Sequence, residues 1–431
     1  MFILNFFKNK NIFLILYGCF LETVFLTVIF LEKIYSDLLN RKVLLYSLFI
    51  LSALSFLILL SKRVKIKGDK QTLKIIIFFL IIFSLTFLFS APLGPGDIYN
   101  YLFRAKIFTY YNQNPFLVPP SNFSNDVLSQ YISPLALSVP SVYGPLWMIF
   151  SLPLAEIAGH NIILGITFFK ILAIIFNFGC LFLIYKIIKQ LNFKNKNLAL
   201  LLYAWNPLIL FEIINDGHND VAMIFFVLLS VCFLLKEKYY FVIPTLMAAI
   251  LIKYIAIIVL PFIFLFLIKK EKNRIKFIII NSAAVLVIII LSYFPFWHGL
   301  QTLGGVLFQG GLVNQNHLSL FPFLIHLFSN EVLIIKAISY SVFGILYLYL
   351  LFFKFPQDEK SLIRSMFFIL TGYIFIASVW LQPWYFIWII PLAIILGKRY
   401  YNFVIFISVF TVIHQGYNIF FLLKKLLCFK F

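Results

Sequence analysis

Apolar runs long enough to cross a lipid bilayer recur along nearly the whole chain, and short polar or basic segments separate them. Because a transmembrane helix needs about 20 mainly apolar residues, the pattern predicts an all-α fold, a polytopic transmembrane helical bundle of about 11 spans. The predicted spans are 11–31, 43–61, 74–91, 162–187, 198–213, 219–235, 277–296, 332–353, 362–380, 384–397 and 402–422.

One apolar segment, residues 241–268, does not fit this scheme. Basic clusters flank it on both sides, so both of its ends are expected in the same compartment. It is nevertheless too short for two full crossings at about 20 residues each. A re-entrant pair of half-helices, with its tip near Lys253 and Tyr254, resolves the conflict and would place the Lys253 ammonium at mid-membrane depth.

Residues 92–145 form a long polar interruption that is rich in Pro and Asn, and it opens with Gly94-Pro95-Gly96-Asp97-Ile98-Tyr99. An acid placed directly after a hydrophobic span is a candidate functional residue. A Gly-Pro-Gly turn would end the preceding helix without needing an acid. The chain has only 15 acidic residues, and most of the others border basic clusters, which favours a functional role for Asp97.

Composition and charge distribution limit the class of protein. With 63% hydrophobic and 12% charged residues, the chain cannot be a soluble globule. The net charge of +20 is divided among short clusters between spans, so it sets membrane topology and does not indicate a nucleic-acid partner. Basic clusters on the cytoplasmic side place segment 92–145 outside, as an outer loop of a cell-membrane protein. The short apolar run 144–158 would then lie along the outer interface or re-enter.

A second polar site lies between the predicted spans 198–213 and 219–235. Glu212, Asp216 and Asp220 are spaced i, i+4 and i+8, but the sequence Asn215-Asp216-Gly217-His218-Asn219-Asp220 is typical of a turn, which would bring the side chains together. His218 with two aspartates could ligate a divalent metal or bind sugar hydroxyls. The alternative is a polar hairpin in which Asp220 caps the following helix.

Lys253 lies among isoleucines, and a lysine in such a position costs roughly a few kcal/mol unless an anion meets it. Its partner is expected to be either a lipid-borne phosphate or one of the carboxylates of the chain. Arg104 could pair with Asp97 or bind an anion, or it could anchor the chain at lipid headgroups. Trp384 and Tyr385 are expected at the outer interface, where they either anchor the protein or stack against a sugar.

Several short motifs, in this order, resemble those of the multi-pass GT-C glycosyltransferases, and most closely the polyprenol-phosphate-mannose-dependent mannosyltransferases. The motifs are Gly96-Asp97-Ile98-Tyr99, Asn114-Pro115-Phe116, Tyr143-Gly144-Pro145, Trp205-Asn206-Pro207, Asn215-Asp216-Gly217-His218-Asn219-Asp220, Leu251-Ile252-Lys253-Tyr254 with Pro261, and Gln382-Pro383-Trp384-Tyr385. The resemblance covers about residues 74–395. It divides the chain into two extra N-terminal spans (1–73), a GT-C-like catalytic module (74–268) and a C-terminal transmembrane region (269–431).

The resemblance implies a function and an assignment of roles. In that family the first large outer loop carries the catalytic acid, which maps onto Asp97, although many members have two acids there. The implied reaction moves a hexose, expected to be mannose, from a polyprenyl-phosphate donor to an extracytoplasmic lipid, glycan or protein acceptor. The implied donor phosphate contacts are Lys253 and Arg104, and the implied sugar or acceptor contacts are Tyr99, Asp216, His218, Asn219, Asp220, Trp384 and Tyr385.

The chemistry of these residues agrees with such a reaction. A polyprenyl phosphate is a good leaving group, so the enzyme needs a base for the acceptor hydroxyl and a cation for the departing phosphate. We therefore expect a single displacement with inversion at the anomeric carbon. No cofactor and no metal ligand are required, while a divalent cation at the acidic turn stays open.

Two other classes of membrane protein would also carry charges within spans. A secondary transporter would be expected to show a repeat between its halves, and none is evident. A lipid-linked sugar flippase would need Lys253 and the interface aromatics but not Asp97. Only the enzyme is expected to lose all activity on the substitution Asp97→Asn.

Overall fold

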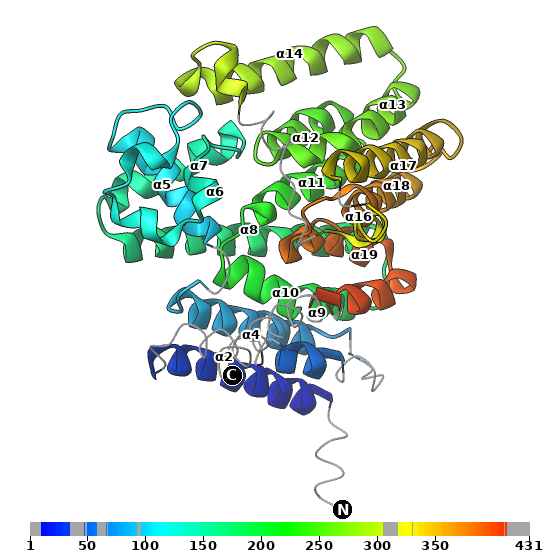
Figure 1. Ribbon diagram of the computed structural model, residues 1–431. Coiled ribbons are helices and arrows are strands. Elements are labelled where there is room, and N and C mark those ends of the chain that lie inside the picture. The colour runs from blue at the N-terminus through cyan, green and yellow to red at the C-terminus, as the bar shows by residue number, and fades with distance from the viewer. Residues whose placement is uncertain are drawn as a thin grey trace, which may run out of the picture. The chain divides into compact units, whose positions relative to one another are not determined.

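The computed structural model describes residues 10–34, 47, 50–57, 66, 68–92, 96–304, 318–329, 331–408 and 410–411. Within these residues all regular secondary structure is helical, and short 3-10 and π segments join the α-helices (Figure 1). The predicted all-α class is confirmed.

Five helical segments in the described ranges are long and apolar enough to cross a membrane. They are α4 (Lys70–Leu88), α8 (Ile162–Gln190), α14 (Arg274–Tyr293) with η6 (Phe294–Phe296), α17 (Val332–Phe352), and α18 (Glu359–Gly372) with the π-helical η9 (Tyr373–Ala377). A polytopic helical membrane protein is therefore confirmed. The total of about 11 crossings stays a prediction, since span 43–61 and the end of span 402–422 lie largely outside the described residues.

A bent pair supplies a sixth crossing if it is one span. Helix α9 (Lys196–Ala204) is followed by α10 (Pro207–Ile209) and the π-helical η3 (Leu210–Asn215), and the two parts meet at 44°. Pro207 has no N–H to continue the helix. The Asn206 side chain accepts from the Leu208 N–H and so starts the next segment.

The described residues pack into two compact units drawn from alternating stretches of the chain. The first consists of Met1–Gly94, Lys170–His218 and Ala393–Phe431. Here α2 (Lys10–Ile34) packs along α4, as the helices with these labels in Figure 1 show. Lys170 is fully buried, and its Nζ donates to the carbonyls of Phe87 at 2.8 Å and Ser90 at 2.7 Å. The C-terminal end of α4 thus provides the negative dipole that this ammonium requires.

The second unit consists of Pro95–Phe169 and Asn219–Leu392. Its main remaining elements are α5 (Asp97–Thr109), η1 (Pro120–Phe123), η2 (Val127–Tyr131), α6 (Pro134–Leu137), α7 (Pro145–Ala158), α11 (Asp220–Leu235), η4 (Tyr239–Phe241), α12 (Val242–Ile250), η5 (Tyr254–Val259), α13 (Leu260–Lys270), η7 (Leu300–Leu303), α16 (Leu320–His326) and η10 (Pro383–Trp388). Two further elements, α19 (Ile390–Leu396) and η11 (Lys398–Tyr400), follow η10 in the chain. The division at residues 73 and 268 stays a prediction.

The polar segment 92–145 is folded where the structure describes it. Its helix α5 packs against α7, and η2 packs against α5 (cyan in Figure 1). Helix α7 has 14 residues, which is too short for a full crossing and agrees with the prediction for run 144–158.

The predicted break in segment 241–268 is confirmed at the expected place. Helix α12 ends at Ile250, Lys253 is extended with φ −145° and ψ 115°, and η5 begins at Tyr254. The segment is therefore two short helical pieces joined at Lys253, as a re-entrant pair requires. Its depth in the membrane stays a prediction.

Candidate active site

Asp97 is the first residue of α5 and is held there by a turn that needs glycine. Gly96 has φ +85°, and a Cβ atom at this position would lie 2.7 Å from the carbonyl oxygen of Tyr131. An L side chain would be strained in this conformation. Asp97 is partly exposed at a helix N-terminus, where the positive end of the helix dipole attracts negative charge.

One face of α5 continues from Asp97 as a polar network. Asn100 Nδ2 donates to the Tyr143 hydroxyl at 3.1 Å. The Tyr101 hydroxyl donates to Asn219 Oδ1 at 3.2 Å. Asn100 and Tyr101 follow Asp97 by three and four residues, which is the spacing of one helix face. This spacing is the sequence signal that could have identified them as site residues. The network joins the beginning of α5 to the residue that precedes α11.

Arg104 lies on the same face and is fully buried. Its Nε donates to Asn100 Oδ1 at 2.8 Å, and its two terminal nitrogens donate to the carbonyls of Val139 at 3.0 Å and Ala136 at 2.9 Å. Burial lowers the pKa of Arg104 to about 10, so the guanidinium is still charged at neutral pH. In this structure Arg104 therefore clamps residues 136–139 onto α5, and it is not open to a donor phosphate. These contacts contradict the prediction that Arg104 binds the donor phosphate.

Lys253 pairs with a carboxylate of the chain, which is one of its two expected partners. Its Nζ lies 2.7 Å and 2.8 Å from the two carboxylate oxygens of Asp220, and Trp388 Nε1 donates to the same carboxylate. Asp220 is fully buried, and the side chain of Lys253 is only 12% exposed. The alternative in which Asp220 caps α11 is wrong, because Asn219 occupies the N-cap position.

Two aromatic rings complete the surroundings of this ion pair. The Lys253 ammonium lies 5.5 Å from the ring centroids of both Tyr385 and Trp388, which are stacked at 4.5 Å. Both distances are within the range of cation–π attraction. Tyr385 was expected near the site, and Trp384 is buried beside it in an edge contact at 6.1 Å. Trp388 was missed, although it follows Trp384 by one helical turn.

Asp97 and Asp220 act electrostatically on the same group. Burial raises the pKa of Tyr101 well above its ordinary value, and the negative charges of Asp97 and Asp220 raise it further. The beginning of α5, the beginning of α11 and the break at Lys253 therefore contribute to one polar site in the second unit.

Asn219 supplies this site with a buried donor that has no partner. Its backbone N–H donates to the Tyr101 hydroxyl at 3.3 Å and its Oδ1 accepts from the same group, while Nδ2 makes no hydrogen bond. An unsatisfied buried donor costs about 1–3 kcal/mol. A sugar hydroxyl or a phosphate oxygen would satisfy it.

The structure brings together part of the predicted acidic turn, while Asp220 is not in this cluster and pairs with Lys253 instead. Glu212, Asp216 and His218 are buried and offer ligand atoms within 4.8 Å of one another. His218 Nε2 lies 3.3 Å from Glu212 Oε2, and Asp216 accepts from Asn215 Nδ2 at 2.8 Å. A set of one imidazole and two carboxylates suits a divalent transition metal. The predicted sugar contacts of Asp216 and His218 stay predictions.

Other motifs also meet in space. Asn114 Nδ2 donates to the Phe296 carbonyl at 2.6 Å and lies 3.0 Å from His298 Nδ1, which ties the Asn114-Pro115-Phe116 motif to the end of η6. Tyr99 stacks on Tyr131 with ring centroids 4.7 Å apart. Tyr99 lies on the opposite face of α5 from Asp97 and lines a pocket of the second unit.

Comparison with known proteins identifies the family. Residues 23–269, more than half of the chain, match the family described as alpha-(1->6)-mannopyranosyltransferase, N-terminal domain. The chain belongs to this family. The matched range contains Asp97, Asp220 and Lys253, and the predicted resemblance to GT-C mannosyltransferases is confirmed.

A curated relative points in the same direction. Alpha-(1->6)-mannopyranosyltransferase A of Corynebacterium glutamicum is 26% identical to this chain over 180 residues, which cover 41% of this chain and 35% of the relative. The chain thus spans about a third of the length of the curated relative that it matches.

Proposed function

We propose that the protein transfers a mannosyl residue from a polyprenyl-phosphate donor to a lipid or glycan hydroxyl on the extracytoplasmic side of the membrane. The observation that carries the proposal is the Tyr101–Asn219 hydrogen bond, which ties the helix that begins with Asp97 to the residue next to Asp220 in the Lys253–Asp220 pair. A base and a cation then belong to one polar site, as a transfer of this kind requires. Membership of a mannosyltransferase family supports the choice of sugar.

In the proposed reaction Asp97 accepts the proton of the acceptor hydroxyl. The acceptor oxygen forms a bond to the anomeric carbon while the bond from that carbon to the phosphate oxygen breaks. The electron pair of the broken bond leaves with the polyprenyl phosphate. Attack from the opposite face inverts the configuration, through a transition state with oxocarbenium character.

Lys253 would stabilise the charge that develops on the departing phosphate. An ammonium has three donors, and the two oxygens of Asp220 hold it from one side at 2.7 Å and 2.8 Å. One N–H of the ammonium therefore remains for a phosphate oxygen, while Asp220, which itself accepts from Trp388, positions the ammonium. The Asn219 Nδ2 group can give a second hydrogen bond to the same phosphate.

A divalent cation has no step in this mechanism. By residue type, Glu212, Asp216 and His218 could hold one. The proposed steps use Asp97, Asp220 and Lys253, and none of these is among the three possible ligands. We propose that transfer requires no cofactor.

The test is sugar transfer by the purified full-length protein in lipid nanodiscs. Radiolabelled polyprenyl-phosphate-mannose and crude membrane acceptors are supplied to the wild type, Asp97→Asn and Glu156→Gln. Glu156 is an exposed acid on α7, so it controls for the loss of one charge. Transfer by the wild type and the control, but not by Asp97→Asn, is the expected result. Absence of transfer in nanodiscs, together with movement of the donor across the membrane of proteoliposomes, would overturn the proposal in favour of a flippase.

A further inference from the structure

The second unit contains a pocket of about 680 Å³ that the proposed mechanism does not use. Its volume is within the range of small-molecule sites. It is formed by α5, by the loop around η2 and by the beginning of α8. Its lining residues are Tyr99, Lys106, Tyr110, Tyr111, Asn125, Asp126, Val127, Tyr131, His160, Asn161, Ile162, Ile163 and Ile166.

The pocket lies on the other side of α5 from Asp97. Tyr99, Lys106 and Tyr110 are spaced i, i+7 and i+11, so they share one face of the helix. Asp97 precedes Tyr99 by two residues, which is a rotation of about 200° around the helix axis. The pocket is therefore separate from the reacting centre, although the same short helix carries both.

The charged groups in the pocket neutralise each other. Lys106 Nζ lies 2.5 Å from Asp126 Oδ2, which also accepts from the Tyr111 hydroxyl at 2.8 Å. Burial acts to raise the pKa of Asp126, but the Lys106 ammonium, the Leu128 N–H and the Tyr111 hydroxyl together lower it. The ion pair therefore persists at neutral pH and leaves the lining without a net charge of its own. Such a lining favours a neutral ligand over a phosphate.

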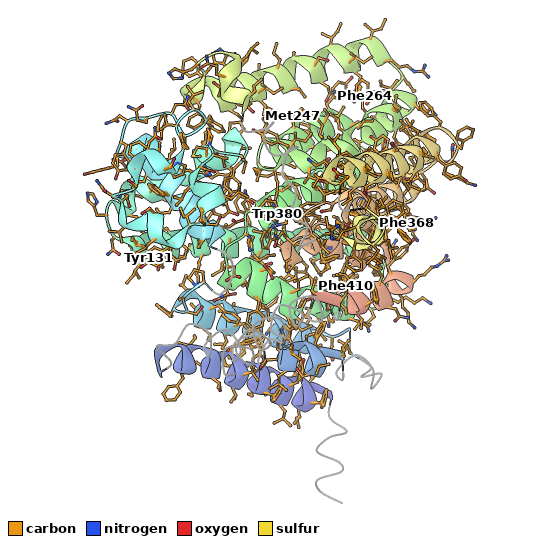
Figure 2. All side chains as sticks on the ribbon, in the orientation of Figure 1. Tyr131, Met247, Phe264, Phe368, Trp380 and Phe410 are labelled. Carbon is orange, nitrogen blue, oxygen red and sulfur yellow. The ribbon has the colours of Figure 1, made fainter. Side chains whose placement is uncertain are left out.

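The aromatic groups provide flat, partly exposed surfaces. Tyr99 and Tyr131 are stacked at 4.7 Å with only 7° between their planes, and Figure 2 labels Tyr131 in this part of the structure. Tyr110 is 52% exposed and Tyr131 is 44% exposed. A tyrosine ring combines an apolar face with a polar tip. A pyranose ring likewise has faces of C–H groups and a rim of hydroxyls, for which Asn125, His160 and Asn161 offer hydrogen bonds.

We propose that this pocket binds a neutral hexopyranose segment of the acceptor glycan, away from the sugar that reacts. Its role as an acceptor site rests on the function proposed above. The first residues of α8, a candidate membrane span, form one wall, so the pocket lies at the end of a span. A glycan held there would lie along the membrane surface and reach the reacting centre with its terminal hydroxyl.

Direct binding tests the pocket without any transfer. The full-length protein in phosphatidylcholine nanodiscs is titrated with an α-(1->6)-linked mannotetraose, and saturation-transfer NMR measures the affinity. We expect the double variant Tyr110→Leu/Tyr131→Leu to weaken binding by about tenfold, from the loss of two stacking faces. The matched control is Tyr349→Leu on α17, since Tyr349 is 45% exposed and lies outside the pocket. Equal affinity of wild type and double variant would overturn the proposal.

Two further results separate this proposal from its competitors. Interfacial tyrosines also anchor proteins at lipid headgroups. Loss of tetraose binding when phosphatidylglycerol replaces phosphatidylcholine would therefore assign the pocket to headgroups and overturn the proposal. Unchanged affinity in both lipids is expected.

Kinetics distinguish failure of the pocket from failure of the proposed function. The double variant should raise KM for the tetraose more than KM for methyl mannoside, because only the longer acceptor reaches the pocket. Asp97→Asn should bind the tetraose like the wild type while it transfers no mannose. Binding without transfer by the wild type would refute the proposed function alone. Transfer by the wild type without binding of the tetraose would refute only the proposal for the pocket.

Discussion

The backbone N–H of Gly144 donates to the carbonyl oxygen of Ile252 at 3.1 Å. The next such bond, from the Leu146 N–H to the Leu251 carbonyl at 3.0 Å, continues the contact. The break after α12 leaves carbonyls without helical partners, and the beginning of α7 has N–H groups without partners. Each helix end therefore satisfies the other, and the contact fixes the backbone directly before Lys253.

Gly144→Ala is expected to destabilise the protein. A Cβ atom at this position would lie 2.0 Å from the Leu251 carbonyl oxygen, so the two helix ends would have to separate. We expect a loss of about 1–3 kcal/mol in the free energy of unfolding. Thermal unfolding in detergent measures it. Gly344→Ala on α17 is the control, because no atom lies within 4 Å of its added Cβ. An equal melting temperature for both variants would contradict the prediction.

Asp97→Asn is expected to reduce transfer by about 10²–10⁴-fold, the usual contribution of a general base. The amide has the same shape but cannot accept the proton, so binding of the donor should be unaffected. Initial rates and a separate donor-binding titration measure the two effects. Glu156→Gln should retain the wild-type rate. A rate for Asp97→Asn within a fewfold of the wild type would remove Asp97 from the mechanism.

Breaking the Lys253–Asp220 pair should destabilise the protein more than replacing both partners. Lys253→Met leaves a fully buried carboxylate unpaired, which costs about 3–5 kcal/mol. In Lys253→Met/Asp220→Leu no buried charge remains, and stability should largely recover. Transfer should stay absent in the double variant, because the cation that stabilises the departing phosphate is gone. Recovery of both stability and transfer would show that Lys253 has only a structural role.

Arg104→Gln is expected to loosen the polar segment around residues 136–139. The substitution removes hydrogen bonds from a charged donor to the Val139 and Ala136 carbonyls, each worth about 1.5–3 kcal/mol. Limited proteolysis should cut this region faster than in the wild type. Affinity for inorganic phosphate is the comparison measurement. Lower phosphate affinity with unchanged proteolysis would show that Arg104 binds phosphate, contrary to its contacts in the structure.

Acid should weaken the contact between α5 and η2 through Asp126. The pKa of this carboxyl is lowered in the folded protein, so its stabilising effect is present above the unfolded pKa of about 3.9 and is lost as the pH falls below that value. We expect the melting temperature to be constant between about pH 7 and 5 and to fall below about pH 4. The melting temperature of Asp126→Asn should fall less steeply as the pH is lowered. Identical pH profiles for the two proteins would contradict the assignment.

The sequence by itself determined the class of the protein and the position of the break at Lys253. Span-length apolar runs require helices, since backbone polar groups in lipid have no other partners. The charged Lys253 interrupts such a run, and this break lies where the residues predict it, whereas the bend at Pro207 falls inside the predicted span 198–213 and was not foreseen. Asp97 was found in the same way, because an acid at the end of a span stands out against an apolar background.

Only the tertiary structure decided which groups meet. It paired Lys253 with Asp220 and Trp388, turned Arg104 inward, and divided α5 into a face with Asp97 and a face with a pocket. In a soluble protein the apolar stripe of a helix shows which side is buried. In a chain of membrane spans the lipid-facing and protein-facing sides are both apolar, so the helix neighbours cannot be read from the pattern. Long-range pairing of polar groups is set by packing, and that information lies in the fold.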